Sequence, residues 1–390
     1  MKFKMLSAAV AVALLSTSAS AVDFTGYARS GVGASADGGM ITSNKDKVGR
    51  LGNENDTYVE LALGQNLYDD SGVKFDIHSL AVFNPGQNAT DYQSDQEVLI
   101  REIYATASGV LGSSTLWAGK RYYQRHDIHI TDDYYWAING DGAGIENIAI
   151  GDTALSLAWF QRGGADGAAN TNILDARLAG IQMWKNASLE LGVTTWMPNA
   201  ESDANDASTM LTAEYVQGDF LGGFNKLIVQ VANQGLANGF TWGTDGSWNA
   251  DDSDAADDSK AFRIYNWGVV SPSEKINVGY TLGFVSGSDL TTTDNGDFTQ
   301  YNVVVRPQYS WTDNMKSQLE VGYYNREEGT ADSSEMKFTV AQTWSPASGF
   351  WSRPEIRVFA TYLADLEDND TRYNGEDDAL SVGVQMEAWW

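Results

Sequence analysis

The feature that most constrains this 390-residue chain is a period-two alternation of apolar and polar side chains that recurs along most of its length. In residues 380–390, every second residue from Leu380 to Trp390 is apolar, and the residues between them, apart from Trp389, are polar or glycine. Such alternation predicts β-strands with one apolar face. After residue 21 no segment offers 18 consecutive apolar residues, so the sequence predicts no membrane-spanning helix.

The pattern favours a transmembrane β-barrel over a soluble β-sandwich, because the face opposite the apolar one is hydrophilic and cannot form a second core layer. Aromatic residues gather at strand ends, and long polar loops, as at 241–259 and 366–378, alternate with tight turns. At about 10 residues for each strand and a similar mean for each connection, the chain makes roughly 18 antiparallel strands. Further strands of the same kind are predicted at 57–65, 155–161, 189–194, 227–231, 301–311 and 356–362.

The first 21 residues have the pattern of a cleaved export signal. Lys2 and Lys4 precede a short apolar stretch at 6–15, and small residues follow it up to Ala21. The apolar stretch is too short to span a bilayer, which takes about 20 residues. We therefore expect cleavage after Ala21 and a single transmembrane β-barrel domain, residues 22–390, in the bacterial outer membrane.

Composition excludes several functions. The chain has no cysteine, which rules out disulfides, thiolate metal sites and a cysteine nucleophile. The net charge of −27 argues against a nucleic-acid partner, because phosphate binding needs clustered Lys and Arg. No serine is paired with a histidine and an acid in a hydrolase pattern, so we expect neither an enzyme nor a cofactor. The aspartates at 251–258 could bind Ca²⁺ or bridge lipopolysaccharide, but a solvated outer loop is the favoured interpretation.

Aromatic residues on the hydrophilic face indicate a ligand. A ring in a water-filled lumen leaves apolar area hydrated, which costs free energy unless something covers it. The C–H face of a pyranose ring is such a cover, and its hydroxyls can bind charged groups; the alternative is that a ring packs against an inward-folded loop. Barrel closure pairs the first strand with the last. By parity the lumenal aromatics are Tyr27, Tyr58, Phe224, Trp351 and Trp389, and closure would make the first and last of them neighbours.

From residue 22 to residue 390 the chain resembles the maltoporins, which are outer-membrane maltodextrin channels. The stretches that carry the resemblance are GYARSGVG (26–33), RLGNENDTY (50–58), WAGKRYYQRHDIH (117–129), YYW (134–136), GAGIEN (142–147), GFNK (223–226), WSRP (351–354), RVFATY (357–362) and QMEAWW (385–390).

The resemblance implies an all-β, 18-stranded antiparallel barrel whose third loop folds into the pore, and a homotrimer in contact with outer-membrane lipid and lipopolysaccharide. It implies facilitated diffusion of maltose and maltodextrins along an aromatic slide that coincides with the five lumenal aromatics. Tyr134 would narrow the channel opposite the slide. The 126–129 segment then belongs to the pore loop, so we expect no metal site there. The polar track beside the slide falls on Arg29, Arg50, Glu60, Arg101, Arg125, Asp127 and Asp132, with His129 nearby.

The chain departs from the family at the pore entrance. Some maltoporins carry a cysteine pair around the first loop, and this chain has none. A slide tryptophan that the family takes from the neighbouring subunit is also missing, since no Trp lies between Tyr68 and Trp117; Tyr92 could replace it. Two alternatives therefore stay open: a related porin selective for sucrose or β-glucosides, and a general porin that prefers cations because its lumen is acidic.

Overall fold

The computed structural model describes residues 22–87, 98–162, 171–198, 207–242, 258–290, 297–329, 331–367, 373 and 375–390. The expected export signal at 1–21 and Tyr92 lie outside these residues, as does most of the loop at 241–259. No helix in the described ranges has the length and apolar character needed to cross a membrane.

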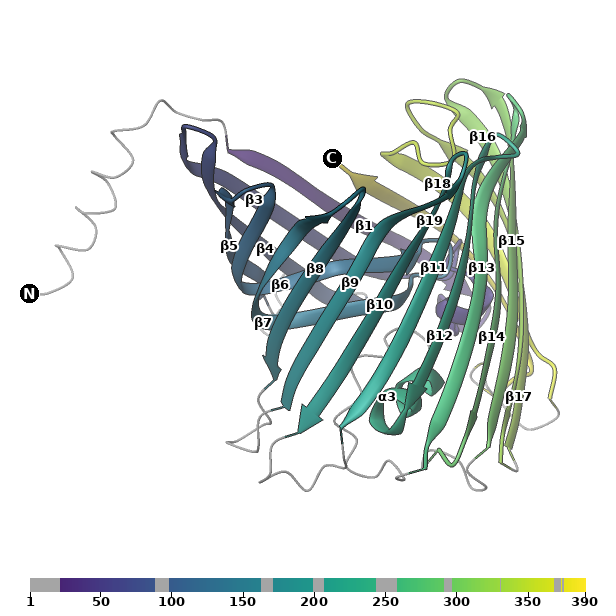
Figure 1. Ribbon diagram of the computed structural model, residues 1–390. Coiled ribbons are helices and arrows are strands. Elements are labelled where there is room, and N and C mark those ends of the chain that lie inside the picture. The colour runs from purple at the N-terminus through teal and green to yellow at the C-terminus, as the bar shows by residue number, and fades with distance from the viewer. Residues whose placement is uncertain are drawn as a thin grey trace, which may run out of the picture.

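Within the described residues, nineteen antiparallel strands form one closed sheet, and since β2 (Gly38–Gly39) has only two residues, eighteen long strands make the wall (Figure 1). The long strands are β1 (Asp23–Ser35), β3 (Asp56–Asp70), β4 (Val73–Gln87), β5 (Val98–Leu111), β6 (Ser114–Ile128), β7 (Asp133–Ile150), β8 (Thr153–Arg162), β9 (Thr171–Trp184), β10 (Ala187–Pro198), β11 (Ser208–Phe220), β12 (Gly223–Asn233), β13 (Lys260–Ser273), β14 (Ile276–Ser288), β15 (Phe298–Thr312), β16 (Met315–Glu328), β17 (Ala331–Trp344), β18 (Glu355–Asp365) and β19 (Asp378–Trp389).

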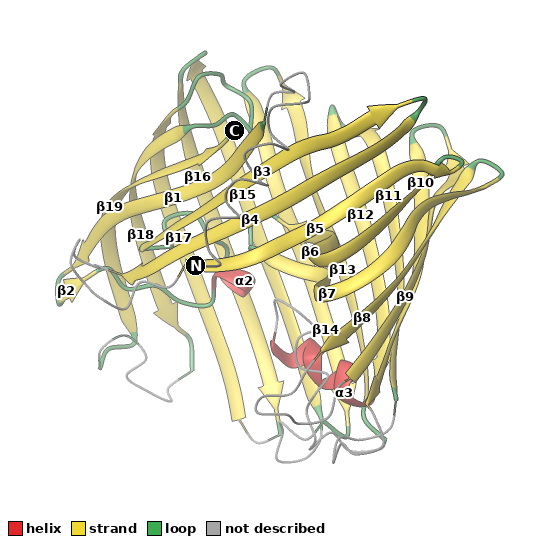
Figure 2. Cartoon of the chain, turned by 90° about the vertical axis from the view of Figure 1, so that its left-hand side faces the viewer, coloured by secondary structure: helices red, strands yellow, loops and turns green. Residues whose placement is uncertain are grey.

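The ring closes through β1, which pairs with β3 on one side and with β19 on the other. Tyr27 lies opposite Glu60 of β3 and opposite Trp389 of β19, so the predicted closure and the predicted neighbours are confirmed. Each predicted strand falls inside an observed one, except that Trp390 lies one residue beyond the end of β19. Figure 2 shows the strands crossing the wall at a slant, as barrel closure requires.

On the strands of the wall, the apolar side chains face outward and the polar side chains face the lumen, as the alternation predicts. On β19 the outward Val382 is 54% exposed, whereas the lumenal Glu387 is 1% exposed. The inner face is thus both polar and buried, because segments from the loops cover part of it. Two of these are short helical segments: α2 (Lys45–Val48) in the β1–β3 connection, and α3 (Gln234–Asn238), which continues as the 3₁₀ helix η2 (Gly239–Trp242) and lies against β11, β12 and β13.

The β1–β3 connection is held to the β16–β18 wall by hydrogen bonds. The backbone N–H of Leu51 donates to Glu320 Oε1 at 2.9 Å. Thr339 Oγ1 donates to the carbonyl oxygen of Leu51 at 3.1 Å, and Thr361 Oγ1 to that of Gly52 at 2.8 Å. Gly52 has a φ of +60° and a Cβ there would lie 2.5 Å from Thr361 Oγ1, so this close approach requires glycine.

Candidate functional site

A cavity of about 560 Å³ lies in the lumen beside β1, β3 and the end of β19. Two larger hollows, of about 820 and 940 Å³, lie on the outer apolar face beside side chains such as Phe262 and Phe338, and they contain none of the predicted site residues. The lumenal cavity is therefore the candidate site. It contains every predicted site residue except Phe224 and Trp351, and is lined by Tyr27, Arg29, Arg50, Tyr58, Glu60, Arg101, Tyr122, Arg125, Asp127, His129, Asp132, Tyr134, Asn139 and Trp389.

Four of the five predicted slide aromatics follow one another along the lumen. The ring centroids of Tyr58 and Tyr27 are 6.1 Å apart, and Trp389 is the register partner of Tyr27 on β19. Trp351 lies beyond Trp389, outside the cavity lining but linked to it through His129, whose ring is 5.6 Å from Trp389 and 5.1 Å from Trp351.

Two of these placements differ from the sequence argument. Trp351 precedes β18, in the connection from β17, so strand parity does not apply to it. The residue is 39% exposed, and its ring meets the line of aromatics from a turn. Phe224 is on β12, where it packs edge-on against Trp267 at 5.0 Å. Parity gives a side chain's face of the wall but not its height on it, and the structure does not bring Phe224 into the cavity.

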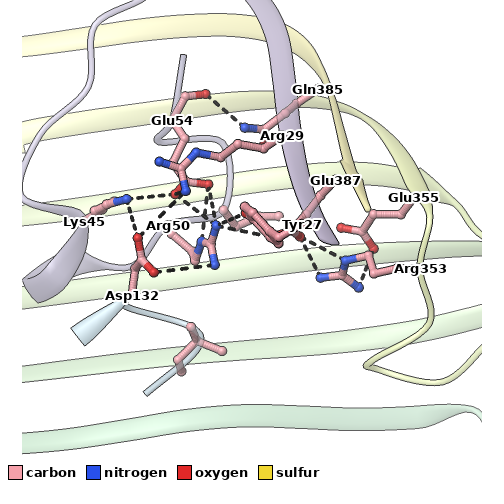
Figure 3. Close-up of polar contacts among 12 residues, drawn as sticks. Tyr27, Arg29, Lys45, Arg50, Glu54, Asp132, Arg353, Glu355, Gln385 and Glu387 are labelled. Atoms are coloured by element: carbon pink, nitrogen blue, oxygen red, sulfur yellow. Dashed lines mark hydrogen bonds and ion pairs between the residues drawn. The ribbon is translucent and has the colours of Figure 1, made fainter. Parts of the chain in front are cut away.

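Part of the predicted polar track is occupied by internal ion pairs (Figure 3). Arg50 donates to the hydroxyl of Tyr27 at 2.7 Å and forms ion pairs with Glu54 at 3.1 Å and Glu387 at 3.2 Å. The Tyr27 hydroxyl in turn donates to Glu387 at 2.9 Å. This network fixes the ring of Tyr27 on the cavity wall.

A second set of pairs extends the network to the β6–β7 connection. Lys45 Nζ lies 3.0 Å from Glu54 and 2.5 Å from Asp132, and Arg29 lies 2.7 Å from Asp56. Sequence reasoning missed Lys45, Glu54 and Glu387. Glu387 shares the lumenal parity of Trp389 and could have been found by that signal, but the two loop residues follow no period.

The loop carboxylates of this network have lowered pKa values. Burial alone would raise the pKa of Glu54, but Arg50, Arg29 and Lys45 outweigh it and hold that pKa well below its usual range. Burial would also raise the pKa of Asp132, but Arg50 and Lys45 outweigh it, and the pKa of this carboxyl is lowered as well. Both groups therefore remain charged at the pH values where free carboxylates begin to take up protons.

The lowered pKa of Glu54 makes the folded state less stable as the pH falls. Because the folded pKa of Glu54 lies below its unfolded value of about 4.3, its stabilisation is complete above that value and is lost as pH falls toward the folded pKa. We expect the unfolding temperature to stay level from pH 7 to about pH 5 and to fall below about pH 4.5. Thermal scans of the wild type and Glu54→Gln test this: the variant should show a shallower acid slope, and parallel slopes would contradict it.

Of the remaining polar track, Glu60 accepts a hydrogen bond from the Tyr58 hydroxyl at 2.5 Å, and three further charged side chains have no such partner in the described part of the chain. The guanidinium carbon of Arg125 lies over two aromatic rings, 4.5 Å from the centroid of Tyr122 and 4.2 Å from that of Tyr134. Among the described residues, neither Arg125, Arg101 nor Asp127 has a side-chain hydrogen bond or ion pair, and Arg101 Nε is buried without a partner. These groups can therefore bind a passing polar ligand.

The β6–β7 hairpin is anchored to lumenal side chains across the barrel. The carbonyl oxygen of Tyr135 accepts a hydrogen bond from Gln230 of β12 at 3.0 Å, and that of Ile130 accepts one from Arg306 of β15 at 3.3 Å. Trp136 lies under Arg177 at 3.9 Å. Gly192 is required beside it, since a Cβ at that position would lie 2.1 Å from the Trp136 ring. The hairpin is thus held from several strands.

The histidines of this hairpin have partners other than a metal. His126 Nδ1 lies 2.7 Å from Glu214, and His129 contacts the two tryptophans. In the described ranges, no three His, Cys, Asp or Glu side chains are grouped so that they could hold a metal ion.

Comparisons with known proteins identify the family. The family model described as LamB porin matches residues 22–390. The maltoporin of Hahella chejuensis is 42% identical, and the match covers 100% of this chain and 98% of that protein. The maltoporin of Photobacterium profundum is 40% identical, with 99% of this chain and 98% of that protein covered. The maltoporin of Vibrio cholerae (El Tor Inaba N16961) is 39% identical, with 100% of both chains covered. Among solved structures, Pseudomonas aeruginosa OccK2 (OpdF) has a TM-score of 0.56 at 9% identity over 94% and 97%, and opdK 0.53 at 12% over 95% and 98%; these support the barrel fold alone. The chain belongs to the LamB porin family and is a non-enzymatic β-barrel porin of the outer membrane.

Proposed function

We propose that this porin is a sugar-selective channel for the facilitated diffusion of maltose and maltodextrins. The observation that carries the proposal is the lumenal cavity, whose lining combines the rings of Tyr58, Tyr27 and Trp389 with three charged side chains that make no hydrogen bond or ion pair within the described residues, namely Arg101, Arg125 and Asp127. A general porin has charges at its constriction but no reason to keep aromatic rings in water. The relatives named maltoporin, about 40% identical over their full length, support the choice of sugar.

In the proposed mechanism, glucose units pass from Tyr58 to Tyr27 and then to Trp389, with their C–H faces on the rings. Each stacked ring contributes roughly 0.5–1.5 kcal/mol beyond plain burial. The hydroxyls exchange hydrogen bonds with Arg125, Asp127 and their neighbours as the chain moves. Several weak sites in series allow both entry and exit, and no covalent bond changes.

The paired and unpaired charges have separate roles in this proposal. Arg50 and Glu387 hold Tyr27 in place, whereas the guanidinium of Arg125, which lies over the rings of Tyr122 and Tyr134, would donate N–H groups to the sugar. The connection between β6 and β7 would act as the inward-folded third loop, with Tyr134 narrowing the channel. Phe224 would contact the sugar only after it has left the cavity.

We extend the proposal to export and assembly. The pattern at 1–21 supports export through a cleaved signal, and the family resemblance supports a homotrimer in contact with outer-membrane lipid and lipopolysaccharide. Any residue that a neighbouring subunit adds to the entrance, such as Tyr92, falls outside the described part of the chain.

Single-channel conductance in a planar bilayer tests the function. We expect maltohexaose at micromolar to millimolar concentration to close the pore in three steps, one for each subunit, and sucrose and cellohexaose to block weakly. Block by sucrose or cellohexaose instead would keep the channel class and change the sugar. Failure of every sugar to block would leave a general porin, whose cation preference is measured in the same apparatus.

A further inference from the structure

One turn of the barrel is longer than its place in the chain requires. The end that carries the short turns, here called the tight-turn end, has seven connections of two residues each, whereas the β17–β18 connection at the same end has ten, residues 345–354. Because antiparallel strands alternate in direction, this connection and the β6–β7 connection leave the wall at opposite ends of the barrel. They nevertheless meet, since the ring centroids of Trp351 and His129 are 5.1 Å apart.

Phe350, the residue before Trp351, forms the buried part of this meeting. Its side chain is 5% exposed and belongs to the same apolar cluster as Ile130, the residue after His129. Both side chains lie against the wall at Gly279 of β14, where an added Cβ would be 2.7 Å from Phe350 Cζ and 3.4 Å from Ile130 Cγ2. Two consecutive residues of the turn therefore meet two consecutive residues of the β6–β7 connection, one pair in the lumen and the other against the wall.

The ring of Phe350 also supports the ring of Trp351. Their centroids are 5.0 Å apart and their planes meet at 73°, which is the edge-to-face geometry that aromatic pairs favour. Trp351 itself is 39% exposed, and the described rings that contact it are those of Phe350 and His129. The buried ring therefore limits the positions that the exposed ring can take.

The backbone of the turn is held by other groups, so Phe350 is not needed to keep the turn in place. Lys316 Nζ donates a hydrogen bond to the carbonyl oxygen of Gly349 at 3.1 Å. Arg353 Nε donates to Glu387 of β19 at 2.9 Å (Figure 3), and its guanidinium also donates to the carbonyl oxygen of Phe350 at 3.3 Å. What the Phe350 side chain adds is the orientation of the neighbouring tryptophan.

We propose that Phe350 is a positioning residue for the tight-turn mouth of the channel. Packed with Ile130 on Gly279, it holds Trp351 where a sugar that enters from this side reaches the line of rings. A ring that is already held in place meets an arriving sugar without the cost of being ordered. The inference rests on the proposed function and adds a side-specific step to it. Phe350 is buried, does not touch the sugar and acts through Trp351.

The test measures the association rate of maltohexaose from each side of a planar bilayer, with the sugar added to one side at a time. Phe350→Ala should lower the rate from one side by about 2- to 12-fold, as the loss of one ring–ring contact implies, and leave the other within about 1.5-fold. Gly279→Ala should lower the same rate, because its Cβ displaces the Phe350 ring. In a Trp351→Ala background, Phe350→Ala should change neither rate.

Phe350→Leu keeps an apolar side chain without a ring, so it should give the same one-sided fall even if the alanine variant does not fold. Phe338→Ala is the matched control, since Phe338 lies on the outward face of β17 and is 43% exposed, and it should leave both rates unchanged.

Two outcomes overturn the inference while the wild type is blocked by maltohexaose. An equal fall of the association rates from both sides would show that Phe350 has only a structural role. An undiminished effect of Phe350→Ala in the Trp351→Ala background would show that it does not act through that ring. A wild-type channel that maltohexaose does not block would contradict the proposed function itself, and the inference with it.

Discussion

Glu320→Gln should destabilise the barrel by about 3–5 kcal/mol, the range found when one partner of a buried ion pair is removed. Glu320 is fully buried on β16 and lies 2.5 Å from both Arg306 Nε and Lys337 Nζ, which are themselves buried. The amide cannot neutralise these two cations. The loss should therefore exceed that of any exposed ion pair on this chain.

The same substitution should loosen two loop segments, because Glu320 also accepts the hydrogen bond from Leu51, and its partner Arg306 binds the carbonyl oxygen of Ile130. Thermal or urea unfolding in detergent micelles measures the free energy of unfolding. Glu274→Gln, in the exposed turn between β13 and β14, is the matched control and should leave stability unchanged. A loss below about 1 kcal/mol for Glu320→Gln would refute the assignment of this pair as a structural centre.

Trp389→Ala should weaken maltohexaose binding by about 10- to 300-fold, the largest effect that we expect on the sugar. The estimate combines a lost ring stack of about 0.5–1.5 kcal/mol with lost burial of about 1–2 kcal/mol, at 1.4 kcal/mol for each factor of ten. Trp389 stands between Tyr27 and His129, so its removal interrupts the line of rings in the middle.

Trp344→Ala controls for the loss of a tryptophan as such. Trp344 lies at the end of β17, is 44% exposed and is absent from the cavity lining. Its removal should leave the binding constant within about 2-fold of wild type, whereas Trp389→Phe should recover most of the loss by restoring a ring. Equal binding constants for Trp389→Ala and wild type, from conductance titration, would exclude the slide as the source of affinity.

The wall of the barrel and much of the site could be predicted from the sequence because strand geometry has a fixed period. Parity alone gives the lumenal face of Tyr27, Tyr58 and Trp389, and closure of the ring makes Tyr27 and Trp389 neighbours. Phe224 shows the limit of parity, which says nothing about position along the barrel axis.

The ion pairs of the loops could not be predicted in this way. Lys45 and Asp132 come from two connections separated by four strands, and no period relates them. The split of the polar track into paired and unpaired groups depends on where each loop lies inside the barrel. That placement is set by hydrogen bonds such as the one from Leu51 to Glu320, which join residues far apart in the chain.

The binding of the first loop to the β16–β18 wall has a consequence for the width of the channel. Glu320, Lys337 and Thr339 on that wall are fully covered, while the cavity lies beside β1, β3 and the end of β19. The cavity therefore lies on one side of the ring, and the circumference set by eighteen strands does not determine its width. Loop residues can therefore be exchanged to change the width of the channel while the surface presented to lipid remains the same.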